Sequence, residues 1–249
     1  MTRIAAHRGG SALWPENSLL AFRSAIALGC DLLELDVHQG RDGVVAVIHD
    51  ATVERTTDGR GAVASLTAAD LRGLRLRGLD GTSSAEHVPT LEEVLAAVAP
   101  SPAGLLIEVK GPSPAERYDE LEERVLAAVT AAGLQARATI MAFDPRVIVR
   151  VRELLPRMRT SFLVDRAAVE PAGVPPEVTI DWARETGATD VGLQYSLLNE
   201  RVVAAARAAS LTLGVWTVNE ESAMRRMLAL GVDVLTTDRP DLARRIVAR

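Results

Sequence analysis

Residues 32–50 read LLELDVHQGRDGVVAVIHD, two aliphatic runs separated by a short polar link. The link at 39–43 is too short for the helical crossover that joins parallel neighbouring strands. Its Asp42-Gly43 pair is a turn signal typical of β-hairpins. We therefore predict a strand over 32–37 and an extra hairpin strand over 44–48 beside it.

The rest of the chain alternates short aliphatic runs with longer segments of helical period, which is typical of parallel α/β folds. Ser18, the capping box at 90–93 and Asp144-Pro145 each indicate the start of a helix. Further helices are predicted over 177–186, 199–209, 220–229 and 240–247. Strands are predicted over 4–7, 32–37, 105–110, 138–143, 160–164, 191–194, 212–217 and 234–237. The hairpin strand apart, these elements form eight βα units, which favour a (β/α)8 TIM barrel over an open doubly wound sheet.

The length of 249 residues suits a single barrel, so we expect one domain over 1–249. Residues 51–89 interrupt the alternation with sequence rich in Thr, Gly and Arg. We predict that this segment is a small insertion after the second strand that passes over one barrel end. Because its apolar residues are few, we expect it to have no separate core.

Composition narrows the class of protein further. Apolar residues make up 48% and charged residues 24%, as in soluble globular proteins. The net charge of −5 is mixed along the chain, which argues against nucleic acid or an anionic membrane as partner and favours a small-molecule substrate. Cys30 is the single cysteine, which excludes an internal disulfide and a thiolate zinc cluster. Strand-like sequence begins at Arg3 and no apolar run approaches ~20 residues, so we expect a cytoplasmic protein without stable membrane insertion. The oligomeric state stays open.

Acidic residues gather at predicted strand ends, where barrel enzymes carry their sites. Glu34 and Asp36 lie two apart in one strand, as do Glu108 and Lys110 in the next, so each pair shares a face. If these faces point inward, three carboxylates converge. A divalent cation would relieve their repulsion, and the all-oxygen ligand set favours Mg²⁺ or Ca²⁺ over zinc.

Two histidine motifs accompany the carboxylates, His7-Arg8-Gly9 and His49-Asp50. Two imidazoles can exchange protons with a substrate, and Arg8 with Lys110 can bind an anion. Together these groups predict metal-assisted hydrolysis of a phosphodiester. His38 and His87 are interpreted as structural, although His38 is close enough to Asp36 to touch the site. Asp238, which precedes Arg239-Pro240, is interpreted as a helix cap.

As an ordered set, these motifs resemble the glycerophosphodiester phosphodiesterase family over nearly the whole chain. The matching stretches are His7-Arg8-Gly9, Pro15-Glu16-Asn17-Ser18, the segments 29–37 and 42–43, His49-Asp50, the segment 55–59, Ile107-Glu108-Val109-Lys110, Trp216-Thr217-Val218-Asn219, Gly231-Val232-Asp233 and Thr237-Asp238-Arg239-Pro240. Ser18 stands where Thr is commoner, and Gln39-Gly40-Arg41 where Leu-Thr-Lys is usual. Neither departure affects a proposed catalytic group.

The resemblance implies a barrel of the phosphodiesterase type that hydrolyses glycerophosphodiesters to glycerol 3-phosphate and an alcohol. It assigns His7 and His49 as the acid/base pair, the metal to Glu34, Asp36 and Glu108, and phosphate contacts to Arg8 and Lys110. From the residues themselves, we interpret Asn17 as a supporting group or substrate contact. Trp216 is a candidate for the wall beside the glycerol group.

Three other functions stay open at this point. One is a lysophospholipase D or sphingomyelinase D-like activity on lipids, against which the polar insertion argues. Another is a barrel aldolase with Lys110 as Schiff-base nucleophile, and the third is a phosphate-binding barrel without catalysis. The acid/base assignment also depends on His49, which a regular hairpin would carry back down the barrel.

Overall fold

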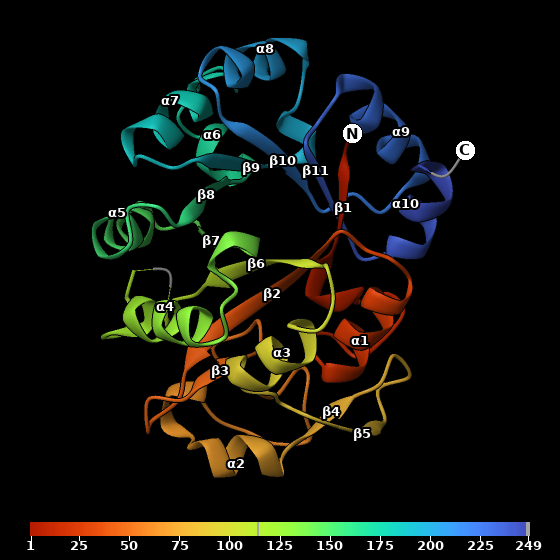
Figure 1. Cartoon of the computed structure of the whole chain (residues 1–249), viewed down its shortest axis with the longest axis vertical. Coiled ribbons are helices and arrows are strands. Elements are labelled where there is room, and N and C mark those ends of the chain that lie inside the picture. Colours follow the sequence, from red (N-terminus) through yellow and green to blue (C-terminus); the bar gives the residue numbers. More distant parts are fainter. Residues whose placement is uncertain (114, 248–249) are drawn as a thin grey trace.

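The computed structural model describes residues 1–113 and 115–247. Within this part of the chain, eight parallel strands form a closed barrel, in which β1 pairs with both β11 and β2 (Figure 1). The barrel strands are β1 (Arg3–Ala6), β2 (Leu32–Gln39), β6 (Gly104–Val109), β7 (Ala138–Ala142), β8 (Arg159–Val164), β9 (Asp190–Gln194), β10 (Thr212–Trp216) and β11 (Val234–Thr237). The predicted TIM barrel is confirmed, and the open sheet is wrong because the first and last strands pair.

Helices connect successive barrel strands and surround the barrel in Figure 1. They are α1 (Leu19–Ala27), α3 (Leu91–Val98), α4 (Leu121–Ala131), α5 (Pro145–Leu154), α6 (Arg166–Val169), α7 (Val178–Glu185), α8 (Glu200–Ala208), α9 (Glu221–Leu230) and α10 (Pro240–Val247), with short 3-10 turns η1 (His7–Gly9), η3 (Gln135–Arg137) and η4 (Tyr195–Leu197). Several begin at the predicted caps: the Ser18 hydroxyl accepts from Ala21 N–H, and Thr90 forms a capping box with Glu93.

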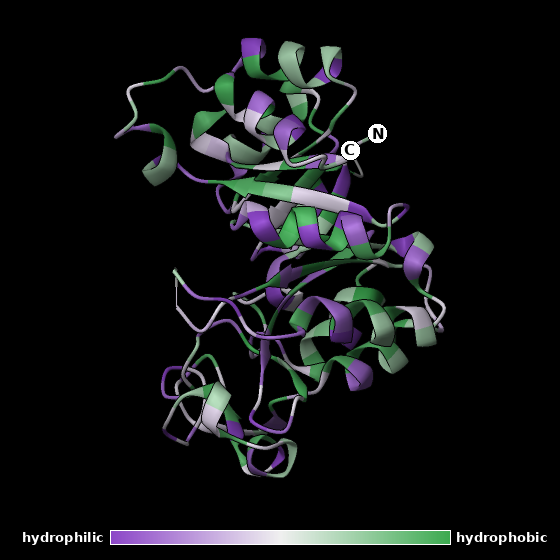
Figure 2. Cartoon of the chain, turned by 90° about the vertical axis from the view of Figure 1, so that its left-hand side faces the viewer, coloured by the Kyte–Doolittle hydropathy of each residue, from purple (hydrophilic) through white to green (hydrophobic). Residues whose placement is uncertain are grey.

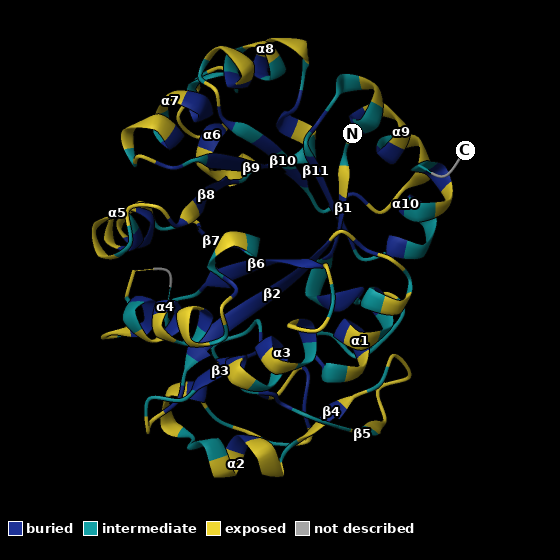
Figure 3. Cartoon of the chain, viewed as in Figure 1, coloured by how far each residue is buried: buried dark blue, intermediate teal, exposed yellow. Residues whose placement is uncertain are grey.

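The main hydrophobic core lies between the strands and these helices. The helices alternate between hydrophilic and hydrophobic residues (Figure 2), and their outer surfaces are exposed while the barrel strands are mostly buried (Figure 3). A second group of apolar side chains fills part of the barrel interior: Ala5, Leu32, Leu106, Met141, Leu163 and Val234. None of the described helices is long and apolar enough to cross a bilayer.

The predicted hairpin strand is confirmed as β3 (Val45–Val47), which runs antiparallel to β2 and pairs Val47 with Val37. On its other edge β2 pairs with β6 only as far as Val37, opposite Val109. The next two residues of β2 pair with β3 alone, so the hairpin turn lies above the neighbouring strand end. This extension sets the height at which β3 returns towards the barrel mouth.

The insertion contains η2 (Val63–Ser65), α2 (Ala68–Gly73) and the two-stranded sheet of β4 (Arg75–Arg77) and β5 (Ser83–His87). It forms a small buried cluster together with the hairpin strand, which was not predicted from the sequence. This insertion cluster comprises Ala46, Ile48, Val53, Val63, Leu71, Leu76 and Val88. The sequence does not indicate this cluster, because each short element contributes a single buried apolar side chain and no apolar run or period results.

Candidate active site

Three carboxylates meet at the carboxyl end of two neighbouring strands. Glu34 and Asp36 come from β2 and Glu108 from β6, where Asp36 and Glu108 are paired in register. All three side chains are buried, and one oxygen from each lies within 4.8 Å of the others. The structure therefore brings together the residues predicted to hold a metal, in an acidic cluster that could bind a divalent cation.

The electrostatics of this cluster fit a hard cation. Burial raises the pKa of Glu34 to about 7, and the charges of Asp36 and Glu108 act in the same direction. Burial also opposes ionisation of Asp36, but Lys110 and Arg8 outweigh it and hold the pKa of that carboxyl well below its usual range. A divalent ion coordinated by oxygen alone would remove the remaining conflict.

His7 begins the turn η1 directly after β1. Its Nδ1 lies 2.6 Å from Asp238 Oδ1, and its Nε2 lies 3.9 Å from Glu34 Oε2. Burial opposes a charge on the ring, but the Glu34 charge and the hydrogen bond with Asp238 outweigh it and raise the pKa of His7. One nitrogen is thus tied to a carboxylate, while the other faces the acidic cluster.

The interpretation of Asp238 as a helix cap is wrong. Besides contacting His7, its carboxylate accepts hydrogen bonds from Ser11 Oγ at 2.5 Å and Asn219 Nδ2 at 2.6 Å, and the helix α10 starts later, at Pro240. Burial opposes its charge, but the bonds with His7, Ser11 and Asn219 lower its pKa to about 2. The sequence did contain one signal for a role of Asp238 in the site: like the other site residues, it lies near the end of a barrel strand.

His49 follows β3 and lines the same cavity as His7, Glu34 and Glu108, a space of about 160 Å³. The amide of Ile48 donates to the Asp36 carbonyl at 3.0 Å, which places His49 close to the level of the acidic cluster. The strand β3 does run back along β2, towards the barrel. Because β2 extends beyond the end of β6, β3 nevertheless ends at the barrel mouth. His49 Nδ1 lies 2.6 Å from Asp50 Oδ1.

His38 supports this arrangement without entering the cavity. Its two ring nitrogens lie 3.0 Å from the Tyr118 hydroxyl and 3.0 Å from the His49 carbonyl oxygen. Burial lowers the pKa of His38 to about 4. A neutral ring that bonds to the backbone of His49 agrees with the structural interpretation, and its contact with the site is through that backbone.

Arg8 and Lys110 line the cavity and neutralise part of the cluster. Arg8 donates from its backbone N–H to Glu34 Oε2 at 2.8 Å, and its Nε lies 3.4 Å from Asp36 Oδ2. Lys110 Nζ lies 3.1 Å from Asp36 Oδ1 and also contacts Glu108. Burial opposes the charge of Lys110, but these two carboxylates outweigh it and raise its pKa.

The two predicted substrate contacts differ in position. Asn17, 2% exposed, donates from Nδ2 to Asp36 Oδ2 at 3.0 Å and is not among the residues that line the cavity. Of its two interpretations, support of a neighbouring group agrees with this hydrogen bond, and no contact with the cavity favours the other. Trp216 does line the cavity, where it packs edge-to-face on Phe143 at 5.3 Å between ring centroids. Phe143 is 40% exposed and was not predicted, because a single aromatic after a strand carries no signal of its own.

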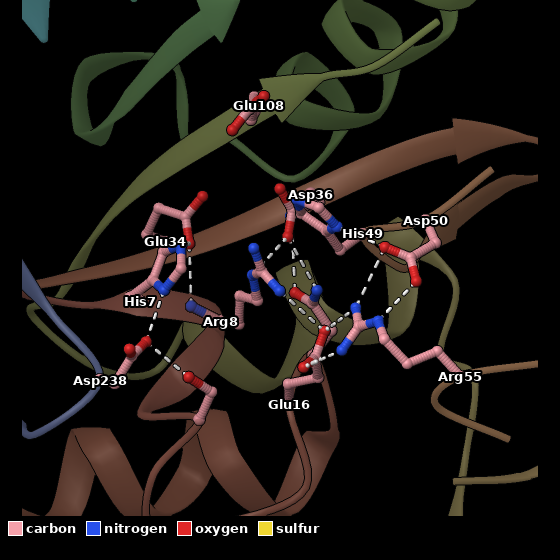
Figure 4. Close-up of polar contacts among 12 residues, drawn as sticks. His7, Arg8, Glu16, Glu34, Asp36, His49, Asp50, Arg55, Glu108 and Asp238 are labelled. Atoms are coloured by element: carbon pink, nitrogen blue, oxygen red, sulfur yellow. Dashed lines mark hydrogen bonds and ion pairs between the residues drawn. The ribbon is translucent and has the colours of Figure 1, made fainter. Parts of the chain in front are cut away.

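Figure 4 shows how these groups are arranged around Asp36, with His7 and Glu34 on one side and His49 and Asp50 on the other. Hydrolysis of a phosphodiester requires proton transfer to and from oxygen and compensation of phosphate charge. The cavity contains groups able to do both, and the barrel places them at its carboxyl end. Fold and site together define a barrel hydrolase of phosphodiesters. The model of the glycerophosphoryl diester phosphodiesterase family matches residues 7–242, so the chain belongs to that family.

Individual relatives agree with this membership. A glycerophosphodiester phosphodiesterase of Caldanaerobacter subterraneus is 32% identical over 96% of this chain and 95% of its own length. One from Bacillus altitudinis is 31% identical over 99% and 98%. A crystal structure of a candidate glycerophosphoryl diester phosphodiesterase from Agrobacterium tumefaciens superposes with a TM-score of 0.91 at 28% identity, covering 100% and 98% of the two chains. The protein is accordingly a phosphoric diester hydrolase that acts on glycerophosphodiesters.

Proposed function

We propose that His7 and His49 form the acid/base pair of this hydrolysis, which releases glycerol 3-phosphate and an alcohol. The observation that carries the proposal is the equivalent setting of the two rings. Each has Nδ1 at 2.6 Å from its own aspartate, and both line one cavity. Within the described residues Nε2 of neither ring makes a hydrogen bond, so it is available to a substrate oxygen.

Glu34, Asp36 and Glu108 would hold the divalent cation, Mg²⁺ or Ca²⁺. When bound, such an ion compensates the charge that develops on the phosphoryl oxygens. Arg8 and Lys110 would contact the phosphate from the same side, because both already lie against Asp36. Trp216 and Phe143 would form the apolar wall beside the glycerol group. If the glycerol group contacts these two rings, the polar end of the cavity is left for the phosphate.

The proton transfers then follow from the hydrogen bonds within the chain. Asp238 and Asp50 each accept a hydrogen bond from Nδ1 of their histidine. This contact directs Nε2 of either ring towards the cavity. One Nε2 would take a proton from the nucleophile, either water or the glycerol hydroxyl of the substrate, and the other would give a proton to the departing alkoxide. Transfer of this kind typically contributes about 10² to 10⁴ in rate.

The alternatives have less support. A Schiff-base aldolase needs a neutral amine, whereas Lys110 lies between two carboxylates that raise its pKa. A lipid-directed activity would be expected to expose apolar surface on the insertion. Its apolar side chains are instead mostly gathered in the insertion cluster, with Leu79 exposed at the β4–β5 turn.

The test is release of alcohol from glycerophosphocholine and glycerophosphoethanolamine, with and without EDTA. We expect activity that is lost in EDTA, is restored by Mg²⁺ or Ca²⁺, and falls at least ~10²-fold in His7→Ala and in His49→Ala. Wild-type turnover in either histidine variant would exclude the acid/base assignment. Trapping by borohydride together with activity in chelator would instead support the aldolase.

A further inference from the structure

Arg55 joins the insertion to the catalytic pair through a chain of alternating charges. Its Nε and Nη2 lie 2.5 and 3.1 Å from the two carboxylate oxygens of Asp50. Its Nη1 and Nη2 each lie 2.8 Å from an oxygen of Glu16 (Figure 4). Asp50 contacts Nδ1 of His49, and Glu16 accepts from Arg8 at 3.0 Å. Arg55 is therefore one side chain away from an imidazole and from an arginine of the cavity.

The two imidazoles depend on different hydrophobic clusters. His7 follows β1, whose Ile4 and Ala6 are buried in the main core. His49 lies between Ile48 and Val53, which both belong to the insertion cluster. Pairing between β2 and β3 ends at Val47, two residues before His49. The backbone of His49 is tied to β2 through the Ile48 amide and the His38 ring, whereas the rest of its surroundings belongs to the insertion. The position of the His49 ring relative to His7 therefore also depends on contacts between the insertion and the barrel.

The guanidinium of Arg55 is suited to orient its partners. It is planar and binds each of the two carboxylates through two nitrogens. It therefore restrains the orientation of each carboxylate as well as its distance. The side chain is 48% exposed, so it contributes little to packing, and exposed ion pairs add little stability. Arg55 is also absent from the residues that line the cavity, and both of its edges are occupied by carboxylates.

We infer that Arg55 is a positioning residue that holds the Asp50 carboxylate against Nδ1 of His49 and anchors both to Glu16. Through this contact the insertion sets the orientation of one of the two catalytic imidazoles. The inference rests on the proposed role of His49. It assigns the insertion a part in the hydrolysis itself, in addition to any contact it makes with substrate.

The test is a double-mutant cycle on glycerophosphocholine hydrolysis with saturating divalent cation, comparing Arg55→Ala, His49→Ala and the double variant. Arg55→Ala should lower kcat about tenfold to a hundredfold with KM changed less. Because the effect passes through His49, adding Arg55→Ala to His49→Ala should cause almost no further loss. Added guanidinium ion should restore part of the activity of Arg55→Ala and none of that of the double variant.

Arg72→Ala is the matched control, because Arg72 lies in the same insertion, is 65% exposed and pairs with Glu93 at 2.7 Å. It should retain wild-type kcat. Arg55→Lys, which keeps the charge but cannot bridge both carboxylates, should fold normally and fall between wild type and Arg55→Ala. An equal loss from Arg55→Ala in wild-type and His49→Ala backgrounds would overturn the inference. Unchanged turnover in His49→Ala alone would instead refute the proposed acid/base pair.

Discussion

His7 Nδ1 and Asp238 Oδ1, 2.6 Å apart, connect the two strands at which the barrel closes. His7 follows β1 and Asp238 follows β11, and these strands are paired in parallel along four residues. Closure of the barrel therefore creates one of the two histidine–carboxylate pairs. The same carboxylate accepts hydrogen bonds from Ser11, in the same β1–α1 connection as His7, and from Asn219, in the β10–α9 connection.

Asp238→Asn should reduce catalysis without removing substrate binding. The charge of Glu34, which raises the pKa of His7 most, would remain, but the amide removes the further contribution of the Asp238 carboxylate and can bond the ring in the wrong tautomer. We expect kcat to fall about 10²-fold or more, as happens when the orienting carboxylate of a hydrolytic triad is replaced. Steady-state kinetics should show the smaller change in KM. Asp241→Asn, which alters a carboxylate paired with Arg239 and Arg245 on the following helix, is the control and should leave kcat intact.

Metal affinity should rise with pH as Glu34 ionises. Its pKa is raised from 4.5 to about 7. Between these pH values Glu34 stays protonated in the metal-free folded protein, whereas it is ionised in the unfolded chain. The contribution of Glu34 to stability is therefore present at low pH and declines as pH rises through about 7. Thermal unfolding in EDTA from pH 5 to 8, compared between wild type and Glu34→Gln, should show a pH-dependent difference that saturating Mg²⁺ or Ca²⁺ changes. A constant difference would contradict the prediction.

Lys110→Gln should destabilise the metal-free protein more than the metal-bound one. It removes the cation between Asp36 and Glu108, and breaking a buried ion pair on one side costs on the order of 3 kcal/mol. A bound divalent ion should offset much of this loss. Denaturant unfolding with chelator and with metal measures the difference. If the variant lost as much stability with saturating metal as without, the cation would not be sharing these carboxylates.

Two glycines in the barrel interior should differ in how much stability an alanine costs. A Cβ on Gly192 would lie 2.5 Å from Leu163 Cδ2, whereas a Cβ on Gly214 would meet its nearest atoms at 3.7 Å. We expect Gly192→Ala to cost about 1–3 kcal/mol through overpacking and Gly214→Ala to be close to neutral. Both line the cavity, so activity should be compared at a temperature where each variant is folded. Equal stability of the two variants would show that Leu163 relaxes freely.

Much of the fold was predictable because it is local in origin. The hairpin at 39–43, the caps at Ser18 and Thr90, and the alternation of strands and helices each depend on neighbouring residues. The acidic cluster was predictable for a related reason: positions two apart share a face, and parallel strands end at the same side of the barrel.

Other parts of the site depend on contacts between distant segments. Asp238 was misinterpreted because its bond to His7 spans 231 positions. For Asn17, support of a neighbouring group and substrate contact both stayed open, because its hydrogen bond to Asp36 spans 19 positions. The insertion cluster combines single apolar residues from several short elements, which leaves no period to detect.

By itself, the sequence determined the order of the βα units, the hairpin after the second strand and the family motifs, since periodicity, turn chemistry and residue identity are properties of short segments. Only the tertiary structure decided which groups meet. Closure of the barrel brought Asp238 to His7, the extension of β2 left His49 at the mouth, and Arg55 bridged the carboxylates of Asp50 and Glu16. The physical reason is that these contacts depend on strand register and packing over long sequence separations, which no local pattern encodes.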